Sequence, residues 1–410
     1  MVEPRLASEK LKRLIATFPV VVVSGARQVG KTTLLRALLP DFDFVTLDPA
    51  IDVESARSEP DLFLANHPGP LVVDEVQYAP PLVSAIKRAV DRDRRPGRFV
   101  LTGSQQWDVM KSITESLAGR VVFIDLLGFT LAEQVGRGGE PSWLGTWLDE
   151  PDRLLERRIK RLSLSASPWE LLWRGQLPDA TRLPLDVLAD FFSAYRRTYV
   201  ERDVRMLADV SDLQLFGRFF GLCAALTGQE INASQLGRDL GVTPQTARRW
   251  LDLLMATFQW VELPAFSGNA VKRVSGRPKG YLSDTGLVCA AQRIPDPLSL
   301  GGHPLTGALF ETAIVHELRA QAALLGTRPT LHHWRSHGGA EVDVIIEYKG
   351  RVYPVEIKAT SHPTRRDARG FGAFREAYPG LDVAPGLVLA PCDGRIRLTE
   401  TDVALPWDLA

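Results

Sequence analysis

One octapeptide constrains the fold of this chain more than any other feature. Residues 25–32 read Gly-Ala-Arg-Gln-Val-Gly-Lys-Thr and match the pattern GxxxxGK[ST] in full. They follow an apolar run, Val20–Ser24, and precede a predicted helix that begins at Lys31. This context gives the pattern its meaning, because backbone N–H groups of the loop and the N-terminus of the helix together form a site for phosphate groups.

The loop predicts ATP binding, with specific roles for its last residues. Lys31 is expected to neutralise the β- and γ-phosphate oxygens, and the hydroxyl of Thr32 is expected to hold Mg²⁺. The predicted cofactors are therefore ATP and Mg²⁺. The predicted nucleotide contacts are the loop and the residue after it, namely Gly25, Ala26, Arg27, Gln28, Val29, Gly30, Lys31, Thr32 and Thr33.

Two further strand ends supply polar side chains that suit this site. The apolar run Leu71–Val73 ends in Asp74 and Glu75. We predict that Asp74 belongs to the Mg²⁺ shell and that Glu75 orients and activates the attacking water. Thr102 and Ser104 end the next predicted strand, where one of them would sense the γ-phosphate. The alternative is that both are ordinary turn residues.

Short apolar strands alternate with helices throughout the N-terminal part of the chain. Such continuous apolar strands are typical of a parallel sheet that is covered on both faces. The sequence therefore predicts an α/β fold here, with five strands at Val20–Ser24, Phe42–Leu47, Leu71–Asp74, Arg98–Thr102 and Val121–Asp125.

The composition is that of a globular chain without a membrane segment. No apolar run approaches the roughly 20 residues that span a bilayer. The three cysteines, Cys223, Cys289 and Cys392, form no CxxC pair, so we expect a reduced cytoplasmic protein without a cysteine metal site. Lys plus Arg and Asp plus Glu each total 49. Because the net charge is zero, any nucleic-acid surface must be local.

The order of these motifs resembles the AAA-type branch of the P-loop ATPases. In that branch a sensor strand lies between the loop strand and the Asp-Glu strand. An arginine just before the fifth strand reaches the nucleotide of a neighbouring subunit, and Arg120 occupies that place here. The resemblance implies that Lys31, Glu75 and Arg120 are catalytic. It stays open whether Arg120 acts in trans within a homo-oligomer, acts in cis, or is a plain surface arginine.

Further segments extend the resemblance along nearly the whole chain. They are Leu101–Ser104, Leu117–Arg120, Trp173–Pro178 and Tyr199–Asp203. Together with the loop they resemble a family of bacterial and archaeal AAA ATPases whose chains end in a conserved domain of uncharacterised function. The charged segment 136–167 lies outside this resemblance. Arg202 and Arg205 are candidates for a second sensor, with a helix-surface ion pair as the alternative.

Residues 234–251 predict a helix, a tight turn and a second helix. Thr243 is a good N-cap and Pro244 a good first helical residue. In a winged helix-turn-helix domain this second helix would read DNA. Between Thr243 and Gly280, six Lys and Arg outnumber two acids. The predicted DNA contacts are Arg248, Arg249, Lys272 and Arg273. The alternative is a packing module without DNA contact.

Near the C-terminus, two predicted strands form a hairpin. Glu341–Tyr348 and Arg351–Lys358 flank Lys349-Gly350, a suitable two-residue loop. In this register Asp343 lies opposite Glu356. Two opposed carboxylates, with β-carbons about 5 Å apart, repel unless a cation lies between them. We therefore predict a second Mg²⁺ or Mn²⁺ at this pair. The opposite face, expected to be the core face, carries Val342, Val344 and Ile346.

An aspartate followed by Glu-x-Lys on the adjacent strand resembles the PD-(D/E)xK nuclease core. In that core a lysine stabilises a phosphate or activates water, and a glutamate on the preceding helix often completes the metal site. The sequence departs from the pattern at Val342, where the family has proline. The alternative is a solvated, charged hairpin face. The implied nuclease residues are Glu311, Asp343, Glu356 and Lys358.

These features divide the chain into four predicted parts. Residues 1–135 form the α/β, parallel-sheet ATPase core, and residues 136–230 form an insert and a helical lid. Residues 231–290 form the winged helix-turn-helix, and residues 300–410 form an α/β, restriction-endonuclease-like domain.

Two functions of different classes fit these parts. In the first, the protein is a Mg²⁺-dependent ATP hydrolase associated with DNA, and its nucleotide state gates the nuclease-like domain. In the second, the protein is an ATP-dependent switch whose terminal domains bind protein or nucleic acid without cleavage. Neither function involves a membrane.

Overall fold

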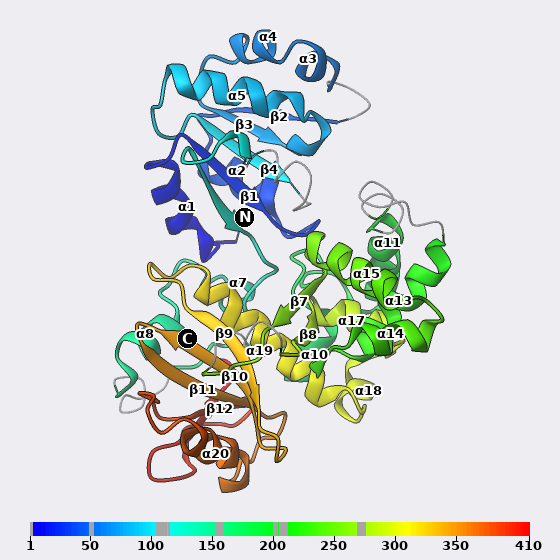
Figure 1. The fold of residues 1–410 in the computed structure, drawn as a ribbon, viewed down its shortest axis with the longest axis vertical. Helices are drawn as coiled ribbons and strands as arrows, with labels where there is room; N and C mark the ends of the chain where they lie inside the picture. The colour runs from blue at the N-terminus through cyan, green and yellow to red at the C-terminus, as the bar shows by residue number, and fades with distance from the viewer. Residues whose placement is uncertain are drawn as a thin grey trace. The chain divides into compact units, whose positions relative to one another are not determined.

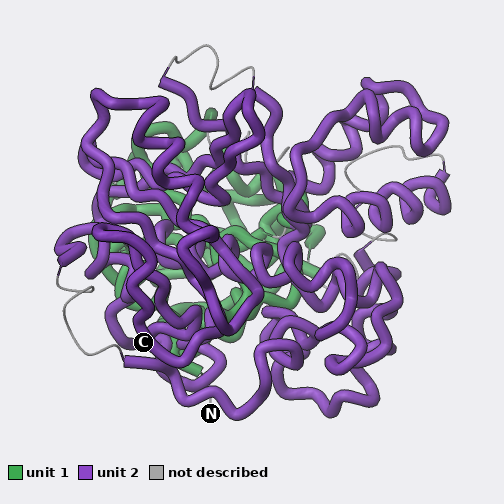
Figure 2. The backbone as a smooth tube through the Cα atoms, turned by 90° about the horizontal axis from the view of Figure 1, so that it is seen from below, with its two compact units in different colours: residues 1–129, 256–258 green, residues 130–255, 259–410 purple. Residues whose placement is uncertain are grey.

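The computed structural model shows a chain that packs as two compact units. It describes residues 3–48, 53–103, 113, 115–152, 160–199, 204, 212–268 and 276–410. The first unit consists of residues 1–129 with 256–258, and the second of residues 130–255 with 259–410 (Figure 2).

The first unit is built on a parallel sheet of order β2-β3-β4-β1-β5. Strand β4 lies between the loop strand β1 and the Asp-Glu strand β3. The five predicted strands and the predicted place of the sensor strand are therefore confirmed. Their bounds are β1 (Val20–Ser24), β2 (Asp43–Thr46), β3 (Leu71–Asp74), β4 (Phe99–Gly103) and β5 (Val121–Asp125).

Helices cover both faces of this sheet (Figure 1). Val20 and Val22 of β1 pack in one apolar cluster with α3 (Val53–Ser58), α4 (Pro60–Ala65) and α5 (Pro81–Arg92). Successive strand residues point to opposite faces, and Val21 and Val23 are buried as well. The other side therefore needs its own cover, and α1 (Ala7–Ile15) contacts both β1 and α2 (Lys31–Leu38) there. A single turn of 3-10 helix, Val76–Tyr78, follows β3.

The second unit begins with a largely helical region that holds a small sheet of order β6-β8-β7. The strands are β6 (Gln229–Glu230), β7 (Trp260–Leu263) and β8 (Lys279–Leu282). The helices are α7 (Leu131–Gln134), α8 (Trp143–Asp149), α10 (Pro168–Arg174), α11 (Leu188–Thr198), α13 (Leu213–Ala225), α14 (Ala233–Leu240), α15 (Pro244–Ala256), α17 (Thr285–Ala291) and α18 (Pro297–Gly301), with a 3-10 turn at Leu185–Val187.

The family segment Trp173–Pro178 anchors this helical region. The indole Nε1 of Trp173 donates to the carbonyl of Ile294 at 2.9 Å. The carboxylate of Asp284, at the N-cap of α17, accepts from the backbone N–H of Gln176 at 2.6 Å and of Leu177 at 3.1 Å. Complete burial raises the pKa of Asp284 to about 6, although these hydrogen bonds by themselves would lower that pKa. The segment therefore has a structural role, because it ties α10 to α17.

The C-terminal part of the second unit is a mixed sheet of order β13-β14-β12-β11-β10-β9. Helices α19 (Thr306–Ala322) and α20 (Arg369–Ala377) flank it, and α8 packs against α19. The hydroxyl of Tyr353 in β11 donates to the carbonyl of Leu148 in α8 at 2.7 Å. The strands are β9 (Thr330–Arg335), β10 (Glu341–Tyr348), β11 (Arg351–Ile357), β12 (Leu387–Ala390), β13 (Ile396–Arg397) and β14 (Val403–Pro406), with a 3-10 turn at Arg365–Ala368.

The β10–β11 hairpin has the predicted register, since Val344 pairs with Val355 and Tyr348 with Arg351. The prediction of a single core face is wrong. Ile345 is fully buried in an apolar cluster with α20, and Asp343 is only 3% exposed. An irregularity in the pairing of β10 with β9, between Val342 and Ile345, changes which residues face the core there. Because both faces of the sheet are covered, Asp343 and Glu356 of the hairpin are buried, whereas Glu341 and Lys349 are exposed.

Among the helices that the structure describes, none is long and apolar enough to cross a membrane.

The contact between α20 and β10 generates a stability prediction. A Cβ atom added at Gly370 would lie 2.1 Å from the backbone oxygen of Glu341, whereas one added at Gly372 in the same helix would meet nothing within 4 Å. We expect Gly370→Ala to lower the free energy of unfolding by about 1–3 kcal/mol, because backbone atoms must move apart. Gly372→Ala should be neutral or stabilising by about 0.5–1 kcal/mol. Denaturant unfolding measures both, and equal effects would contradict this packing.

Candidate functional site

The phosphate-binding loop has the backbone that its glycines predict. Gly25 has a φ of 152°, and a Cβ there would lie 2.2 Å from the backbone oxygen of Leu126. Gly30 precedes α2 in the left-handed region, with a φ of 91°. Both positions favour glycine, because a side chain would clash at the first and strain the backbone at the second. The loop therefore lies tightly on the segment that follows β5.

The two side chains with predicted phosphate and magnesium roles begin helix α2. Lys31 is buried, and its Nζ donates to the carbonyl oxygens of Gly25 and Ala26, each at 2.8 Å. The hydroxyl of Thr32 donates to Oδ2 of Asp74 at 2.8 Å. A hydroxyl beside a carboxylate at the start of a loop helix fits the oxygen ligands that Mg²⁺ prefers.

Thr102 connects the two acidic residues at the end of β3. Its hydroxyl donates to Oδ1 of Asp74 and accepts from the backbone N–H of Glu75 at 3.0 Å. The backbone of Glu75 is left-handed, with a φ of 61°, and the amide of Gln77 donates to its carboxylate. Neighbouring strands β3 and β4 thus bring the predicted sensor, metal and water residues together. We interpret Thr102 as a positioning residue for Asp74 and Glu75.

Two supports of this site escaped the sequence analysis. Arg5, 5% exposed, donates to the carbonyl of Val29 at 2.7 Å and to the carbonyl of Leu127 at 2.7 Å. It thereby joins the loop to the segment after β5. Ser24 donates to Asp125 at 2.6 Å, between the ends of the paired strands β1 and β5. No motif marks Arg5, since its partners are backbone atoms far away in sequence.

Arg120 lies at the amino end of β5, next to the start of β1. Val20 donates to the backbone oxygen of Arg120 at 3.3 Å, and the guanidinium of Arg120 donates to Asp91 of α5 at 2.6 Å. The loop follows the carboxyl end of β1, five residues away. At about 3.3 Å per residue, the strand separates Arg120 from the loop by roughly 16 Å. Arg120 therefore lies at the amino ends of the strands, and the predicted nucleotide site lies at their carboxyl ends.

Several predicted residues lie outside the described part of the chain. They are Ser104 of the sensor pair, Arg202 and Arg205 of the second-sensor hypothesis, and Lys272 and Arg273 of the DNA patch.

A second charged cluster joins all four residues of the nuclease-like pattern. Asp343 and Glu356 lie at the end of the hairpin opposite its turn, and Glu311 comes from α19. The backbone N–H of Ile357 donates to Oδ2 of Asp343 at 2.9 Å. Nζ of Lys358 donates to Glu356 at 2.5 Å and lies 3.8 Å from Oδ2 of Asp343. The pattern predicted which residues gather here.

The cluster contains two residues that the sequence analysis did not assign to it. Nζ of Lys279, on β8, lies 2.6 Å from Oε1 of Glu311 and 3.0 Å from Oδ1 of Asp343. The hydroxyl of Tyr281 donates to the same Glu311 oxygen at 2.6 Å. The only advance signal was the alternation Lys279-Gly280-Tyr281, which placed both side chains on one face of a strand.

Lysine side chains lie beside the predicted metal pair, and the metal ion at Asp343 and Glu356 stays a prediction. Among the described residues, no group of three or more His, Cys, Asp or Glu side chains is arranged to hold a metal ion. Each of the two carboxylates faces a lysine instead, Asp343 that of Lys279 and Glu356 that of Lys358. The cation that two opposed carboxylates require is thus supplied by the chain.

Burial dominates the electrostatics of the cluster. It raises the pKa of Glu311 to about 7, with a further contribution from the Asp343 charge and opposition from Lys279. Burial, followed by Asp343, also raises the pKa of Glu356. Burial alone would lower the pKa of Lys279, but the carboxylates of Asp343 and Glu311 outweigh it and raise that pKa. Lys279 is therefore a permanent cation in this environment.

The predicted helix, turn and helix are confirmed as α14 and α15, and the Thr243 hydroxyl caps α15 by accepting from Thr246 N–H at 3.1 Å. Arg248 is engaged within the chain, by Asp252 at 2.7 Å and Glu262 at 3.3 Å. Arg249 is exposed. The winged-helix assignment and its DNA contacts stay predictions.

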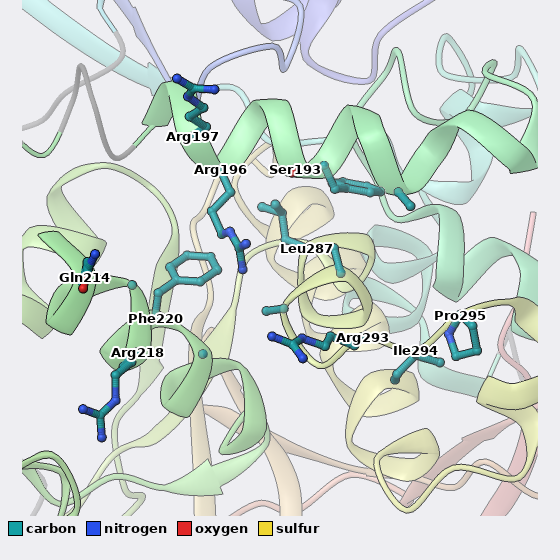
Figure 3. Close-up of a pocket in the computed structure, with 16 residues that line it drawn as sticks. Ser193, Arg196, Arg197, Gln214, Arg218, Phe220, Leu287, Arg293, Ile294 and Pro295 are labelled. Carbon is teal, nitrogen blue, oxygen red and sulfur yellow. The ribbon is translucent and has the colours of Figure 1, made fainter.

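A basic cavity in the helical region was not predicted. It has a volume of about 940 Å³ and lies between α11, α13 and α17. Figure 3 shows Arg196 and Arg293 directed towards its middle, whereas Arg218 points away. No carboxylate is among its described lining residues, which include the guanidinium groups of Arg196, Arg197, Arg218 and Arg293. The cavity is therefore a basic concave surface of this helical region.

Comparison with protein families agrees with the geometry of the nucleotide site. The AAA domain family matches residues 17–135, which contain the loop, Asp74, Glu75 and Thr102. Two domains of unknown function follow, DUF8612 at residues 166–298 and DUF4143 at residues 306–410. Residues 17–135 of the chain thus form a P-loop domain of the AAA type.

Two mycobacterial relatives define its family. They are uncharacterized protein Rv2008c of Mycobacterium tuberculosis and uncharacterized protein Mb2031c of Mycobacterium bovis, each 32% identical over 410 residues. The match covers 100% of this chain and 84% of each relative. The protein belongs to the same family as these two proteins.

Among solved structures, the chain is similar to the Walker-type ATPase PABY2304 of Pyrococcus abyssi, with a TM-score of 0.41 and 15% identity. The similarity covers 71% of this chain and 96% of that one.

The bonds of Thr102 generate a prediction about turnover. Thr102→Val removes the hydroxyl that joins Asp74 to the Glu75 backbone, and a lost hydrogen bond to a charged group costs about 1.5–3 kcal/mol. We expect kcat for ATP to fall roughly 10- to 100-fold, with nucleotide affinity nearly unchanged. Thr102→Ser keeps the hydroxyl and should retain most of the activity. Equal kcat values for the valine and serine variants would remove the hydroxyl from this role.

Proposed function

We propose that the protein hydrolyses ATP by direct attack of a water molecule that Glu75 orients. The observation that carries this proposal is the chain of contacts from Thr32 to Asp74, Thr102 and Glu75 at the end of the parallel sheet. Lys31 binds the β- and γ-phosphates from the helix N-terminus. Mg²⁺, when bound by Thr32 and Asp74, supplies positive charge to the phosphate oxygens.

In this proposal Glu75 acts on water rather than on the metal, and the geometry at the end of β3 supports that role. Its left-handed backbone turns it away from the line of β3, and its N–H is held by Thr102. Gln77 donates to Oε2 of Glu75, so we assign Oε1 as the acceptor for the attacking water. A carboxylate in this role lowers the barrier to hydrolysis without adding to ground-state affinity.

The assigned roles of Lys31 and Glu75 generate a test with opposite outcomes. Lys31→Ala should abolish nucleotide binding, because the lysine contacts phosphates in the ground state. Glu75→Gln should bind ATP normally and turn over several orders of magnitude more slowly. Titration of a fluorescent ATP analogue and a phosphate-release assay measure the two effects. Lys87→Ala, at an exposed lysine of α5, is the control. Wild-type turnover by Glu75→Gln would exclude its role with water.

We also propose that Arg120 acts only between subunits of a homo-oligomer. Its place at the amino ends of the strands supports this proposal, since the loop of the same chain lies at their carboxyl ends. An arginine from a neighbouring subunit stabilises the charge that develops on the transferred phosphoryl group. The ion pair with Asp91 holds the guanidinium near the surface, at 25% exposure of the Arg120 side chain.

For the second unit, the proposal is a DNA-associated module of nuclease-like design that responds to the nucleotide state. The convergence of Glu311, Asp343, Glu356 and Lys358 supports the nuclease-like part. The exposed Arg249 and the basic cavity around Arg196 and Arg293 offer sites for phosphates.

One observation favours the alternative function, a switch that binds without cleavage. Lys279 occupies the space between Glu311 and Asp343, so the cluster as arranged does not fit a divalent ion. We therefore expect the chain in this arrangement to bind DNA and not to cleave it.

Supercoiled plasmid tests the two functions in one assay. Without nucleotide, we expect salt-sensitive binding and no nicking in Mg²⁺ or Mn²⁺, because Lys279 closes the cluster. Nicking that appears with ATP, and disappears in Asp343→Asn but not in the exposed control Glu341→Gln, would establish gated cleavage. Absence of binding at low salt would contradict any DNA association.

A further inference from the structure

The starting observation is a balance of charge in a buried space. Three carboxylates, from Glu311, Asp343 and Glu356, share one cluster with the ammonium groups of Lys279 and Lys358. The Lys279 and Glu311 side chains are 10% and 13% exposed, and that of Asp343 is 4% exposed. Buried carboxylates this close repel each other strongly unless cations separate them. The two lysines therefore hold the cluster together.

Lys279 and Lys358 differ in where they come from. Lys358 ends the Glu-x-Lys pattern directly after β11, and its Nζ lies 2.5 Å from Oε1 of Glu356, two residues earlier. Lys279 comes from β8, a strand of the small three-stranded sheet rather than of the C-terminal sheet. It bridges Glu311 of α19 and Asp343 of β10, which no other described side chain connects directly. Lys279 is thus a member of the cluster that does not belong to the nuclease-like sequence pattern.

The position of the Lys279 ammonium group matches that of a bridging metal ion. Its nitrogen lies 2.6 Å from one carboxylate oxygen and 3.0 Å from the other. Mg²⁺ and Mn²⁺ bind carboxylate oxygens at slightly shorter distances, about 2.0–2.2 Å. Small movements of two side chains would bring both oxygens into that range. An ammonium group and a divalent ion cannot occupy this space together.

We propose that Lys279 is a built-in replacement for a divalent cation, and that the space between Glu311 and Asp343 is a latent Mg²⁺ or Mn²⁺ site which the lysine keeps closed. This inference rests on the nuclease-like arrangement proposed above. It names the group that regulates that arrangement. Metal enters only when the Lys279 side chain leaves, so lysine and metal exclude each other.

An open cavity gives solvent and ligands access to this space. It has a volume of about 410 Å³, and both Lys279 and Glu311 line it. Arg277, His333 and Arg335 are also at its wall. Burial lowers the pKa of His333, and its Nε2 lies 2.9 Å from the carbonyl oxygen of Arg277. The cavity therefore provides a route for a hydrated ion to reach the carboxylates.

Replacement of Lys279 by methionine tests the proposal on the full chain. The variant keeps a long apolar side chain and removes the ammonium group that competes with metal. Mn²⁺ binding is measured by electron paramagnetic resonance in nucleotide-free buffer. We expect Lys279→Met to bind one additional Mn²⁺ at least tenfold more tightly than wild type does. The double variant Lys279→Met/Asp343→Asn should lose this gain, which distinguishes the cluster from the loop site.

Two control variants separate charge from general disturbance. Lys279→Arg keeps a cation and should bind Mn²⁺ no better than wild type. Lys349→Met removes an exposed lysine at the hairpin turn and should also leave Mn²⁺ binding unchanged. Thermal melting of Lys279→Met should be lower than wild type in EDTA and should recover with Mn²⁺, because metal replaces the missing charge. A folded Lys279→Met that binds no additional Mn²⁺ overturns the proposal.

Chemical labelling of wild-type lysines covers the case in which Lys279→Met does not fold. Amine acetylation mapped by mass spectrometry should show Lys279 protected and Lys349 reactive. Mn²⁺ that binds through Asp343 should expose Lys279 to labelling. Binding of Mn²⁺ through Asp343 while Lys279 stays protected overturns the proposal. The absence of Mn²⁺ binding through Asp343 in every folded variant, at Mn²⁺ concentrations up to about 10 mM, also overturns it. That concentration is about a thousandfold above a Kd of roughly 10 µM. If Lys279→Met binds Mn²⁺ but does not nick DNA, the proposal of cleavage fails and this inference stands.

Discussion

The nucleotide site depends on a single carboxylate, Asp74, that accepts hydrogen bonds from two different strand–loop junctions. Thr32 reaches it from the start of α2, and Thr102 reaches it from β4. The parallel order of the sheet makes this possible, because the carboxyl ends of β1, β3 and β4 lie side by side. An order that moved β1 or β4 away from β3 would separate these groups. Arg120 lies at the opposite, amino end of these parallel strands, next to the start of β1.

The C-terminal cluster follows a different physical principle. Its carboxylates come from a helix and two strands, and burial of their charges costs desolvation free energy. The chain resolves this with lysines, one within the Glu-x-Lys pattern and one from the neighbouring small sheet. Lys279 gives the cluster a closed form that is stable without any ion. It also makes the small sheet part of the C-terminal site, because β8 carries the competing cation.

Local patterns were informative where a function requires neighbours in sequence. The loop glycines, the strand ending in Asp74 and Glu75, and the hairpin register around Val344 were all read correctly, because each depends on backbone geometry over a few residues. The pattern could not predict the burial of Asp343. That burial comes from an irregularity in β10 and from cover on both faces of the sheet, which involve α19 and α20 at a distance in sequence.

The sequence by itself indicated an AAA-type P-loop domain and the loop expected to bind phosphate, because the glycine loop is one short segment. It also determined which carboxylates and which lysine gather in the hairpin. Only the tertiary structure decided what those charges do. Arg5 and Lys279 show the reason: each acts on partners that are far away along the chain, Val29 and Leu127 for the first and Glu311 and Asp343 for the second. Electrostatic interaction depends on distance in space and on burial, and the packed chain alone defines both.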